Sequence, residues 1–382
     1  PSIIPVYDDR RDDAVFPKKY TSPEQVGLTN NFNNPVATAN YYDNRNETYQ
    51  VLTNFYAQLN LIPDKLNIRS SYSYDYSMIR GSEFTPTYYV GTNQKKEVTE
   101  LTKKNTNYYK YIWDNVATYT DKWGKHSFTG MLGASMRQEQ YRLLEGTATN
   151  VPEGEDVWKY IALGNKEGAT VKDDGWKYRG LSYFTRLNYN YNDKYMLMFT
   201  FRADGSSKYN DKWGYFPSIG AAWVISQEPF MKNQNIFDYM KLRASWGMTG
   251  NQEGIGNYDS RSLANGGHNY NGQDGIAITT LANPDLKWEK SDQTNIGLDL
   301  SLFNDRVTVG MDYFIKNTKD LLYDRPLHTT TGFSSITQNI GSMRNTGFEF
   351  NVESHNIMND RFSWDTPVSY THLRAHETSL HL

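Results

Sequence analysis

The sequence predicts an all-β protein: an antiparallel transmembrane β-barrel with short turns on one side of the membrane and long loops on the other. Three observations predict this fold. Apolar and polar residues alternate, short and long connections alternate, and aromatic residues gather near both ends of the strands.

The alternation is clearest in four segments, residues 66–76, 181–191, 294–302 and 307–315. On one parity 19 of 22 positions are apolar or aromatic, against 2 of 18 on the other. A period of two residues therefore describes these segments, and the helical period of 3.6 does not. Each strand is expected to have one apolar and one polar face.

The connections between strands are of two kinds. Short polar turns are expected at residues 63–65, 121–124, 192–194, 304–306 and 359–361, with a looser one near 233–238. Long Gly-, Asn-, Asp- and Thr-rich loops are expected at residues 80–107, 143–176, 203–214, 249–289 and 317–336. Compact soluble domains favour connections of ~4 to 6 residues, whereas an outer-membrane barrel has short periplasmic turns and long outer loops. The pattern favours lipid at the apolar face and a lumen at the polar face.

Aromatic residues, including 30 Tyr and 9 Trp, support the same orientation. Those near the short turns are Trp123, Tyr189, Tyr191, Tyr195, Phe303 and Tyr313, and those towards the long loops are Trp213, Tyr215, Trp246 and Trp288. Two such belts are typical of the two interfaces of a membrane barrel. Ordinary cross-strand aromatic pairs in a soluble β-sandwich are the alternative explanation.

Composition excludes several classes of function. Lys and Arg number 40 against 43 Asp and Glu, so there is no basic excess for a nucleic-acid partner. The absence of Cys excludes disulfides, thiolate catalysis and Cys-ligated metals. The mean hydropathy of −0.74 and the lack of a run of ~18 apolar residues argue against a membrane helix, but barrel strands need only ~9 to 11 residues.

Candidate reactive sites are weak. The best metal-ligand spacing is His372, His376 and His381 near the end of the chain, which would share a face only on a helix. The Gly-rich run 250–256 has no following Lys-Ser/Thr, and the acidic clusters 153–156 and 173–174 match no calcium loop. No nucleophile–base–orienter set is visible, so we expect no enzyme activity, no cofactor and no metal.

Six runs appear in order along the chain: Tyr178-Arg179-Gly180-Leu181-Ser182-Tyr183-Phe184, Arg202-Ala203-Asp204-Gly205-Ser206-Ser207, Phe216-Pro217-Ser218, residues 241–252 (KLRASWGMTGNQ), residues 283–289 (NPDLKWE) and residues 339–349 (NIGSMRNTGFE). Together they closely resemble the barrel of SusC/RagA-type TonB-linked (TonB-dependent) outer-membrane transporters of Bacteroidota. The resemblance is specific over residues 178–366 and rests on the strand pattern alone over residues 31–142.

The resemblance implies a barrel of 22 strands, a plug domain inside it, an N-terminal segment that contacts TonB, and a SusD-like lipoprotein that covers the mouth. This sequence shows only about a dozen strands, and neither the plug nor the TonB-contacting segment. We therefore expect residues 1–366 to be part of such a barrel. Residues 367–382 leave the alternation and resemble translated adapter sequence, so they are left out of the fold prediction.

The function that the resemblance implies is multi-pass outer-membrane active transport of a nutrient, energised through TonB. A glycan or oligosaccharide is the first expectation, with a peptide and then a siderophore or vitamin as alternatives. Alternative hypotheses from other functional classes are a passive outer-membrane pore, a barrel enzyme, and a secreted β-sandwich or adhesin module.

Two groups of residues are candidates for binding. On the polar parity, those expected to face the lumen and contact a plug or a solute are Asn67, Arg69, Arg186, Asn188, Asn190, Asn295, Asp299 and Asp312. In the long loops, the aromatic residues expected to stack on sugar rings or contact the lid lipoprotein are Tyr88, Tyr89, Trp158, Tyr160 and Tyr270.

Overall fold

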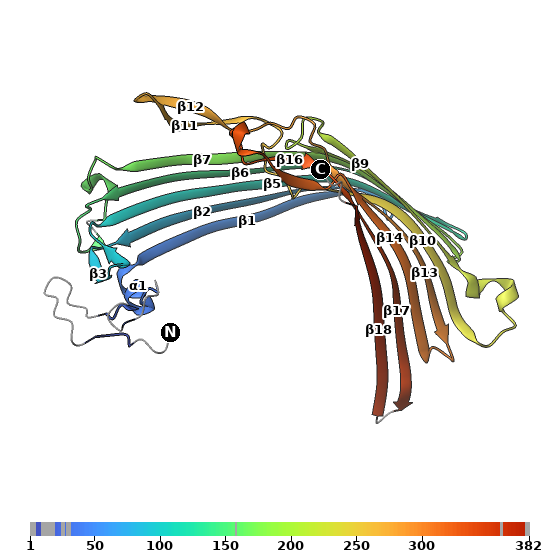
Figure 1. Cartoon of the computed structure of the whole chain (residues 1–382). Coiled ribbons are helices and arrows are strands. Elements are labelled where there is room, and N and C mark those ends of the chain that lie inside the picture. The colour runs from blue at the N-terminus through green and yellow to red at the C-terminus, as the bar shows by residue number, and fades with distance from the viewer. Residues whose placement is uncertain are drawn as a thin grey trace. The chain divides into compact units, whose positions relative to one another are not determined.

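The computed structural model describes residues 5–8, 20–23, 27, 32–156, 159–359 and 362–378. Most of these residues form strands. Twelve strands join one antiparallel sheet in the order β1-β2-β5-β6-β7-β8-β9-β10-β13-β14-β17-β18 (Figure 1). No helix in these described ranges is long and apolar enough to cross a membrane. The predicted fold class, an antiparallel barrel wall of about a dozen strands, is confirmed.

The bounds of the twelve sheet strands follow chain order. They are β1 (Asp43–Ile62), β2 (Leu66–Thr85), β5 (Glu100–Trp123), β6 (His126–Thr149), β7 (Thr170–Tyr191), β8 (Tyr195–Ser206), β9 (Trp213–Val224), β10 (Phe237–Asn251), β13 (Glu289–Leu302), β14 (Val307–Lys319), β17 (Ser342–Asn359) and β18 (Phe362–Thr378).

Smaller elements lie in the connections. Three hairpins are β3 (Tyr88–Gly91) with β4 (Gln94–Lys96), β11 (Leu263–Tyr270) with β12 (Gln273–Thr280), and β15 (Leu322–Pro326) with β16 (Ser335–Asn339). The helices are α1 (Pro35–Tyr41) and the single 3-10 turns η3 (Ile161–Leu163), η4 (Ile225–Gln227), η5 (Pro229–Met231) and η6 (Thr329–Thr331).

The predicted short turns are confirmed where they are described. Asp64, Asn192, Asn304 and Asp305 have φ of 61°, 54°, 58° and 60°, and Gly124 has φ of 56°. Gly, Asn and Asp tolerate this left-handed conformation better than other residues, which explains why they occupy these hairpin turns. The looser connection at 225–236 holds η4 and η5, while the turn predicted at 359–361 includes residues 360 and 361, which are outside the described ranges.

Three of the predicted long loops are clearly shorter than expected, because strands continue into them. The loops predicted at 80–107, 143–176 and 203–214 reduce to residues 86–99, 150–169 and 207–212, and the first of these holds β3 and β4. β5 and β6 each have 24 residues, although ~9 to 11 suffice to cross a bilayer. The ends of these strands that extend into the predicted loops show no apolar–polar alternation, because both of their faces carry polar residues.

Part of the segment 367–382, which was left out of the fold prediction, forms a strand. Residues 367–378 belong to β18, which pairs with β17 from Asn359↔Phe362 to Ser342↔Thr378, with one register shift between His355 and Ile357. Backbone hydrogen bonds join the two strands regardless of side-chain alternation. The adapter origin of residues 367–382 stays a prediction.

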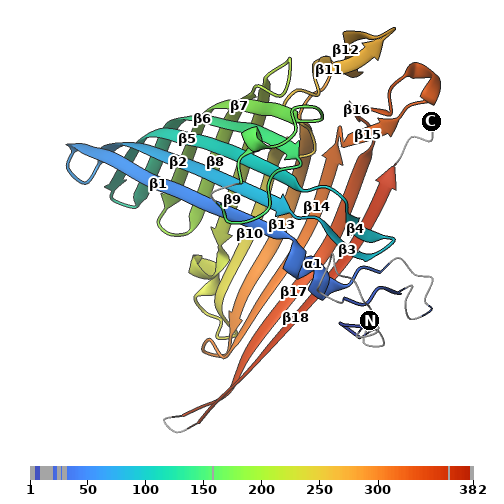
Figure 2. The same cartoon turned by 90° about the vertical axis from the view of Figure 1, so that its left-hand side faces the viewer.

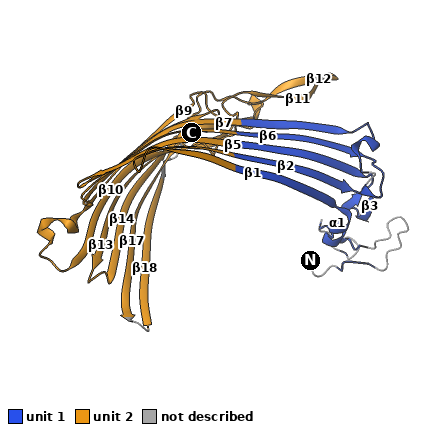
Figure 3. Cartoon of the chain, turned by 180° about the vertical axis from the view of Figure 1, so that it is seen from behind, with its two compact units in different colours: residues 1–53, 74–110, 139–177 blue, residues 54–73, 111–138, 178–382 orange. Residues whose placement is uncertain are grey.

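The chain divides into two compact units, coloured separately in Figure 3. Unit 1 comprises Pro1–Thr53, Tyr74–Lys110 and Glu139–Lys177, and unit 2 comprises Asn54–Ser73, Tyr111–Gln138 and Tyr178–Leu382.

Unit 1 has two small apolar cores. One contains Phe84, Leu101, Ala148 and Val151 with Ile161 against them, and the other contains Tyr20, Ala37 and Val90 with Val36, Tyr41 and Tyr88. Helix α1 was not expected from the sequence, although its signal is there. The Asn34 side chain accepts hydrogen bonds from the amides of Val36 and Ala37 at 3.1 and 3.2 Å, and Pro35 fits the first helical position.

Unit 2 contains one apolar core among its loops, formed by Tyr209, Phe216, Ile255, Leu286 and Trp288. The Trp288 side chain is only 6% exposed, so Trp288 is part of this core and the expectation that it belongs to an interfacial belt was wrong. Burial raises the pKa of the Tyr209 phenol, and the Lys208 ammonium donates to the carbonyl oxygens of Gln252 and Ile255 at 3.1 and 2.8 Å. These contacts fix the start of the long β10–β13 connection.

The sheet of unit 2 is apolar on its exposed face. Leu242, Trp246, Ile296, Tyr313 and Phe348 are between 37% and 52% exposed and lie on β10, β13, β14 and β17, which run side by side in Figure 2. In β10 the polar residues Arg243 and Ser245 between them are half-buried. This arrangement is the reverse of a soluble sheet and fits a wall that faces lipid.

Candidate functional site: the polar face of the barrel wall

The strand register of unit 2 places six of the predicted lumen residues on one face of β7, β13 and β14. Residues directly opposite in an antiparallel pair project to the same side. One face can thus be followed from β7 to β10. Asn190 lies opposite Met196, Met196 lies opposite Ala222, and Ala222 lies opposite Arg243.

The same face continues across the next strands. Arg243 lies opposite Gly297, and Gly297 lies opposite Asp312. Asn295 and Asp299 flank Gly297 at i ± 2 on β13, so they share its side of the strand. Arg186 and Asn188 share the side of Asn190 for the same reason.

Arg243 joins two of these residues into a charged cluster. Its Nε and Nη2 donate to the two carboxylate oxygens of Asp299, both at 2.9 Å, and Nη2 also donates to Oδ2 of Asp312 at 3.0 Å. The bidentate geometry is the strong form of an arginine–carboxylate contact. The side chains of Arg243, Asp299 and Asp312 are 37%, 34% and 27% exposed, so solvent screens part of their attraction. With two carboxylates for one guanidinium, the cluster carries a surplus negative charge.

Gly297 makes the space that this cluster occupies. A Cβ atom at Gly297 would lie 2.7 Å from Cζ of Arg243 and would also collide with Oδ1 of Asp312. A side chain at this position would therefore push the guanidinium out from between its two carboxylates. The glycine at the centre of β13 is thus explained by the close approach of charged groups.

Two hollows beside the cluster are lined by the other predicted residues of this face. One of about 410 Å³ is lined by Asn188, Asn190 and Arg243 together with small residues such as Gly220 and Ala222. Its neighbour, of about 630 Å³, is lined by polar residues that include Arg186 and Asn295. Oδ1 of Asn190 is buried without a hydrogen-bond partner, while its Nδ2 donates to Asp193 at 2.6 Å. The face therefore offers polar groups and space at the same place.

Two predicted lumen residues lie elsewhere on the sheet. Asn67 and Arg69 are on β2, which β5 and β6 separate from β7. The Arg69 guanidinium lies 4.2 Å from the ring centroid of Tyr56 on β1. The structure does not bring these two residues to the Arg243 cluster.

The predicted loop aromatics have different environments. Tyr270 and Tyr160 are 85% and 57% exposed and free to meet a ligand. The ring of Tyr88 stacks on Tyr41 with centroids 4.6 Å apart, and Tyr89 follows it on β3 with 37% exposure. Trp158 lies outside the described residues.

The histidine spacing near the end of the chain does not make a helical face. His372 and His376 are on strand β18, where residues four apart are separated by about 13 Å. His381 lies outside the described residues. Within the ranges that the structure describes, no cluster of three or more His, Asp or Glu is placed to hold a metal ion.

Sequence comparison decides the family. The family model described as "TonB dependent receptor-like, beta-barrel" matches residues 4–380. The chain belongs to this family of TonB-dependent receptor barrels. Its members are outer-membrane proteins, so the apolar face of the sheet is the face that meets outer-membrane lipid.

Individual TonB-dependent receptors are similar over most of the chain. The chain is 34% identical over 343 residues to TonB-dependent receptor P39 of Formosa agariphila, which covers 89% of this chain and 33% of the relative. It is 38% identical over 201 residues to TonB-dependent receptor SusC of Bacteroides thetaiotaomicron, covering 50% of this chain and 20% of SusC. The chain spans about a third of the length of P39.

A solved structure agrees. The structure of the RagAB peptide transporter superposes with a TM-score of 0.81 at 26% identity, covering 91% of this chain and 38% of the RagAB chain. The resemblance to SusC/RagA-type receptors is thereby confirmed.

Arg243 was missed as a site residue, although it lies within one of the runs that suggested the family. Its sequence signal is the alternation Leu242-Arg243-Ala244-Ser245-Trp246, which places it on the polar parity of β10. That it bridges Asp299 and Asp312 depends on the register of three strands. Spacing along one strand cannot reveal it.

Proposed function

We propose that this chain is part of the wall of an outer-membrane transporter that imports a nutrient with energy delivered through TonB. The observation that carries the proposal is the polarity of the unit 2 sheet: exposed apolar side chains on one face, and the Arg243 cluster with its two hollows on the other. Membership of the TonB-dependent receptor family supports it. On this proposal the polar face meets a plug domain or a passing solute, because a barrel of many strands is too wide for its own side chains to fill.

Of the two, a plug domain suits the Arg243 cluster better than a passing solute does. A surplus negative charge held at a fixed place on the wall attracts a cationic side chain of a neighbouring domain. We propose further that a SusD-like lipoprotein covers the outer loops, as the similarity to the RagAB transporter and to SusC suggests.

The transport proposal is tested with the full-length protein in cells. We expect uptake of a labelled nutrient to stop when a protonophore collapses the inner-membrane proton gradient, and to stop when TonB is deleted. Uptake that continues unchanged under both treatments would identify a passive pore and overturn the proposal.

For the substrate we propose an oligosaccharide. Exposed aromatic rings such as Tyr160 and Tyr270 suit stacking on sugar rings. A peptide is the second candidate, because the RagAB chain that superposes on this one is a peptide transporter.

The two substrates are separated by binding to the full-length protein. Tyr160→Ala and Tyr270→Ala are expected to weaken oligosaccharide binding roughly tenfold, the loss of about 1.4 kcal/mol that one stacking contact contributes. Tyr313→Ala removes another exposed ring, from the apolar face of β14, and serves as the control. Unchanged oligosaccharide affinity in both loop variants, with measurable peptide binding, would favour the peptide.

A further inference from the structure

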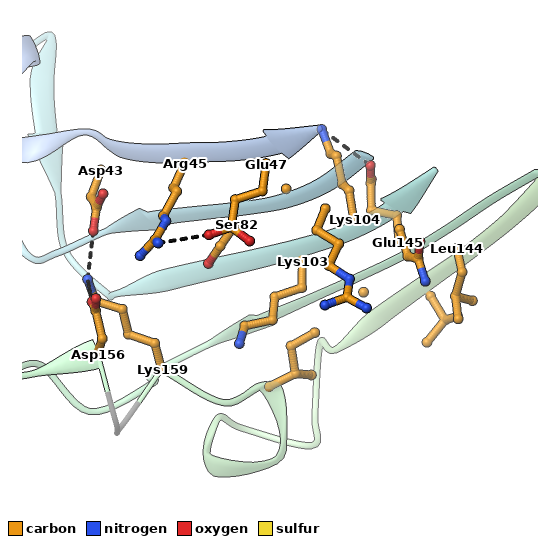
Figure 4. A pocket seen from close by; sticks show the side chains of 16 residues that line it. Asp43, Arg45, Glu47, Ser82, Lys103, Lys104, Leu144, Glu145, Asp156 and Lys159 are labelled. Atoms are coloured by element: carbon orange, nitrogen blue, oxygen red, sulfur yellow. Dashed lines mark hydrogen bonds and ion pairs between the residues drawn. The ribbon is translucent and has the colours of Figure 1, made fainter. Parts of the chain in front are cut away.

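Unit 1 contains a pocket that the transport proposal does not use. Its volume is about 740 Å³, and it lies between the ends of β2 and β6 and the starts of β1 and β5, with Asp156 and Lys159 at one side (Figure 4). We propose that this pocket binds an acidic sugar headgroup, carrying phosphate or carboxylate, of a glycolipid in the outer leaflet.

The charges of the pocket leave a positive surplus. Most of its ionised side chains are paired with one another, and the pairs are Arg45–Glu47 at 2.7 Å, Lys104–Glu145 at 3.3 Å, Lys159–Asp43 at 2.7 Å and Lys159–Asp156 at 2.9 Å. Arg80 and Lys103 also line the pocket, and neither is paired with a carboxylate among the described residues. In all, five basic side chains line the hollow against four carboxylates, a surplus of one positive charge, and such a surplus favours an anion.

Aromatic rings hold both unpaired cations. The Lys103 ammonium lies 5.1 Å from the ring centroid of Tyr160, and the Arg80 guanidinium lies 5.7 Å from that of Tyr49. Cation–π contacts orient a positive group without neutralising it, so the charge stays available to a ligand. Gly146 in the lining keeps side-chain bulk out of the hollow, because a Cβ there would meet Ile161.

The position of the two cations on their strands points to the membrane. Arg80 follows Tyr74, Tyr76 and Met78 on the same parity of β2, and this parity is the apolar one that the alternation assigns to lipid. Lys103 has the parity of Tyr109 on β5, and the rings of Tyr109 and Tyr76 are in contact at 5.0 Å. Both cations are therefore on the outward face of the wall.

The position of the site along the strands indicates which part of the glycolipid it would contact. Tyr rings of a barrel sit at headgroup level, and Arg80 is four residues beyond Tyr76, about 13 Å further along the strand. An anion held there belongs to the sugar layer above the acyl boundary. Basic pockets on membrane proteins bind anionic headgroups in this way, because Coulomb attraction adds to the burial of the acyl chains nearby.

The test uses the full-length receptor in detergent and two probes: purified rough lipopolysaccharide in mixed micelles, and the water-soluble core oligosaccharide made from it by deacylation. We expect the receptor to bind the lipopolysaccharide. We expect it to bind the deacylated core much more weakly than the lipopolysaccharide. Arg80→Ala with Lys103→Ala should weaken lipopolysaccharide binding roughly tenfold or more, the loss expected when charge-assisted contacts are removed.

Two further variants serve as controls. Lys95→Ala removes an exposed cation that pairs with Glu97 outside the pocket, and should bind as the unmodified receptor does. Arg80→Lys with Lys103→Arg keeps both charges and should retain binding, which separates a loss of charge from a loss of folding. Unchanged lipopolysaccharide binding in the double alanine variant would overturn the proposal. So would equal affinity for the acylated and deacylated probes, because the ligand would then be a diffusible saccharide.

Discussion

The position of the Arg243 side chain depends on residues from three neighbouring strands. β10 supplies the guanidinium, β13 supplies Asp299 and the bare backbone of Gly297, and β14 supplies Asp312. The two aspartates were predicted to face the lumen from the alternation of their own strands. The arginine that joins them and the glycine that admits it require knowledge of which residues lie opposite, and alternation along a single strand contains no such information.

Gly297 and Gly310 form a matched pair that tests this packing. Both are on the polar face, but a Cβ at Gly297 would collide with Arg243 and Asp312, whereas the nearest atom to a Cβ at Gly310 is Cβ of Asn351 at 4.0 Å. Gly297→Ala is therefore expected to lower the free energy of unfolding by up to about 1 kcal/mol, because the colliding groups are the ends of half-exposed side chains that can shift by giving up their ion pairs. Gly310→Ala is expected to be neutral or to stabilise by about 0.4–1 kcal/mol, because it restricts the unfolded chain.

The measurement is urea unfolding of the full-length receptor in detergent, followed by tryptophan fluorescence. Equal stability of Gly297→Ala and Gly310→Ala would show that the Arg243 cluster rearranges freely and does not depend on the glycine.

At the scale of elements, the sequence pattern predicts strands well where one face meets lipid and poorly where both faces meet water. Residues 181–191 and 307–315 alternate and were predicted, and both lie within strands β7 and β14. The start of β7, Thr170–Gly175, carries Lys172, Asp173 and Asp174 in succession and was predicted as loop. No physical difference between its faces marks it as a strand, so only its pairing with neighbours reveals it. Helix α1 was missed for another reason, since its cap signal was present and outweighed by the β-rich pattern around it.

The connection between β9 and β10 provides a prediction about pH. Between η4 and η5 the buried Glu228 carboxylate accepts hydrogen bonds from the Tyr195 hydroxyl at 2.5 Å, the Trp223 indole at 3.2 Å and the Lys194 ammonium at 3.4 Å. These contacts, the Tyr195 hydrogen bond foremost, hold the pKa of Glu228 below its ordinary value. The contribution of Glu228 to stability is therefore complete above the ordinary glutamate pKa of about 4.5 and is lost as the pH falls through the lower, folded-state pKa.

The measurement compares melting temperatures of the full-length receptor and Glu228→Gln between pH 3 and pH 7. We expect the variant to melt lower at pH 7, and the difference to shrink as the pH approaches 3. Glu253→Gln, at an exposed loop carboxyl, is the control and should differ little from the unmodified receptor throughout. A difference between Glu228→Gln and the receptor that stays constant across the range would show that ionisation of Glu228 does not stabilise the turn.

At the scale of the whole chain, the lipid-facing surface and the polar face depend on the same alternation, so neither is a local feature. The apolar side chains of Leu242, Ile296 and Phe348 are exposed because lipid is their solvent, and the opposite parity is thereby left for charged and small residues. Family membership follows from this pattern together with the motif runs. The substrate does not, because the residues that select it lie in loops whose lengths and contacts obey no period.

The sheet order leads to a last prediction. Among the described strands, β1 and β18 each have a single neighbour in the sheet, so one side of each presents unpaired N–H and C=O groups. In hydrocarbon each unsatisfied group costs several kcal/mol, which is why membrane sheets close into barrels. The 382-residue chain expressed alone is therefore expected to fail to insert into detergent micelles or vesicles as a folded species, whereas the full-length receptor should do so. Folded barrels migrate differently on a gel before and after boiling, and this shift is the measurement. A heat-resistant monomer of the isolated chain would mean that β1 and β18 find each other or that polar residues shield both edges, and sheet closure would then not require the rest of the receptor.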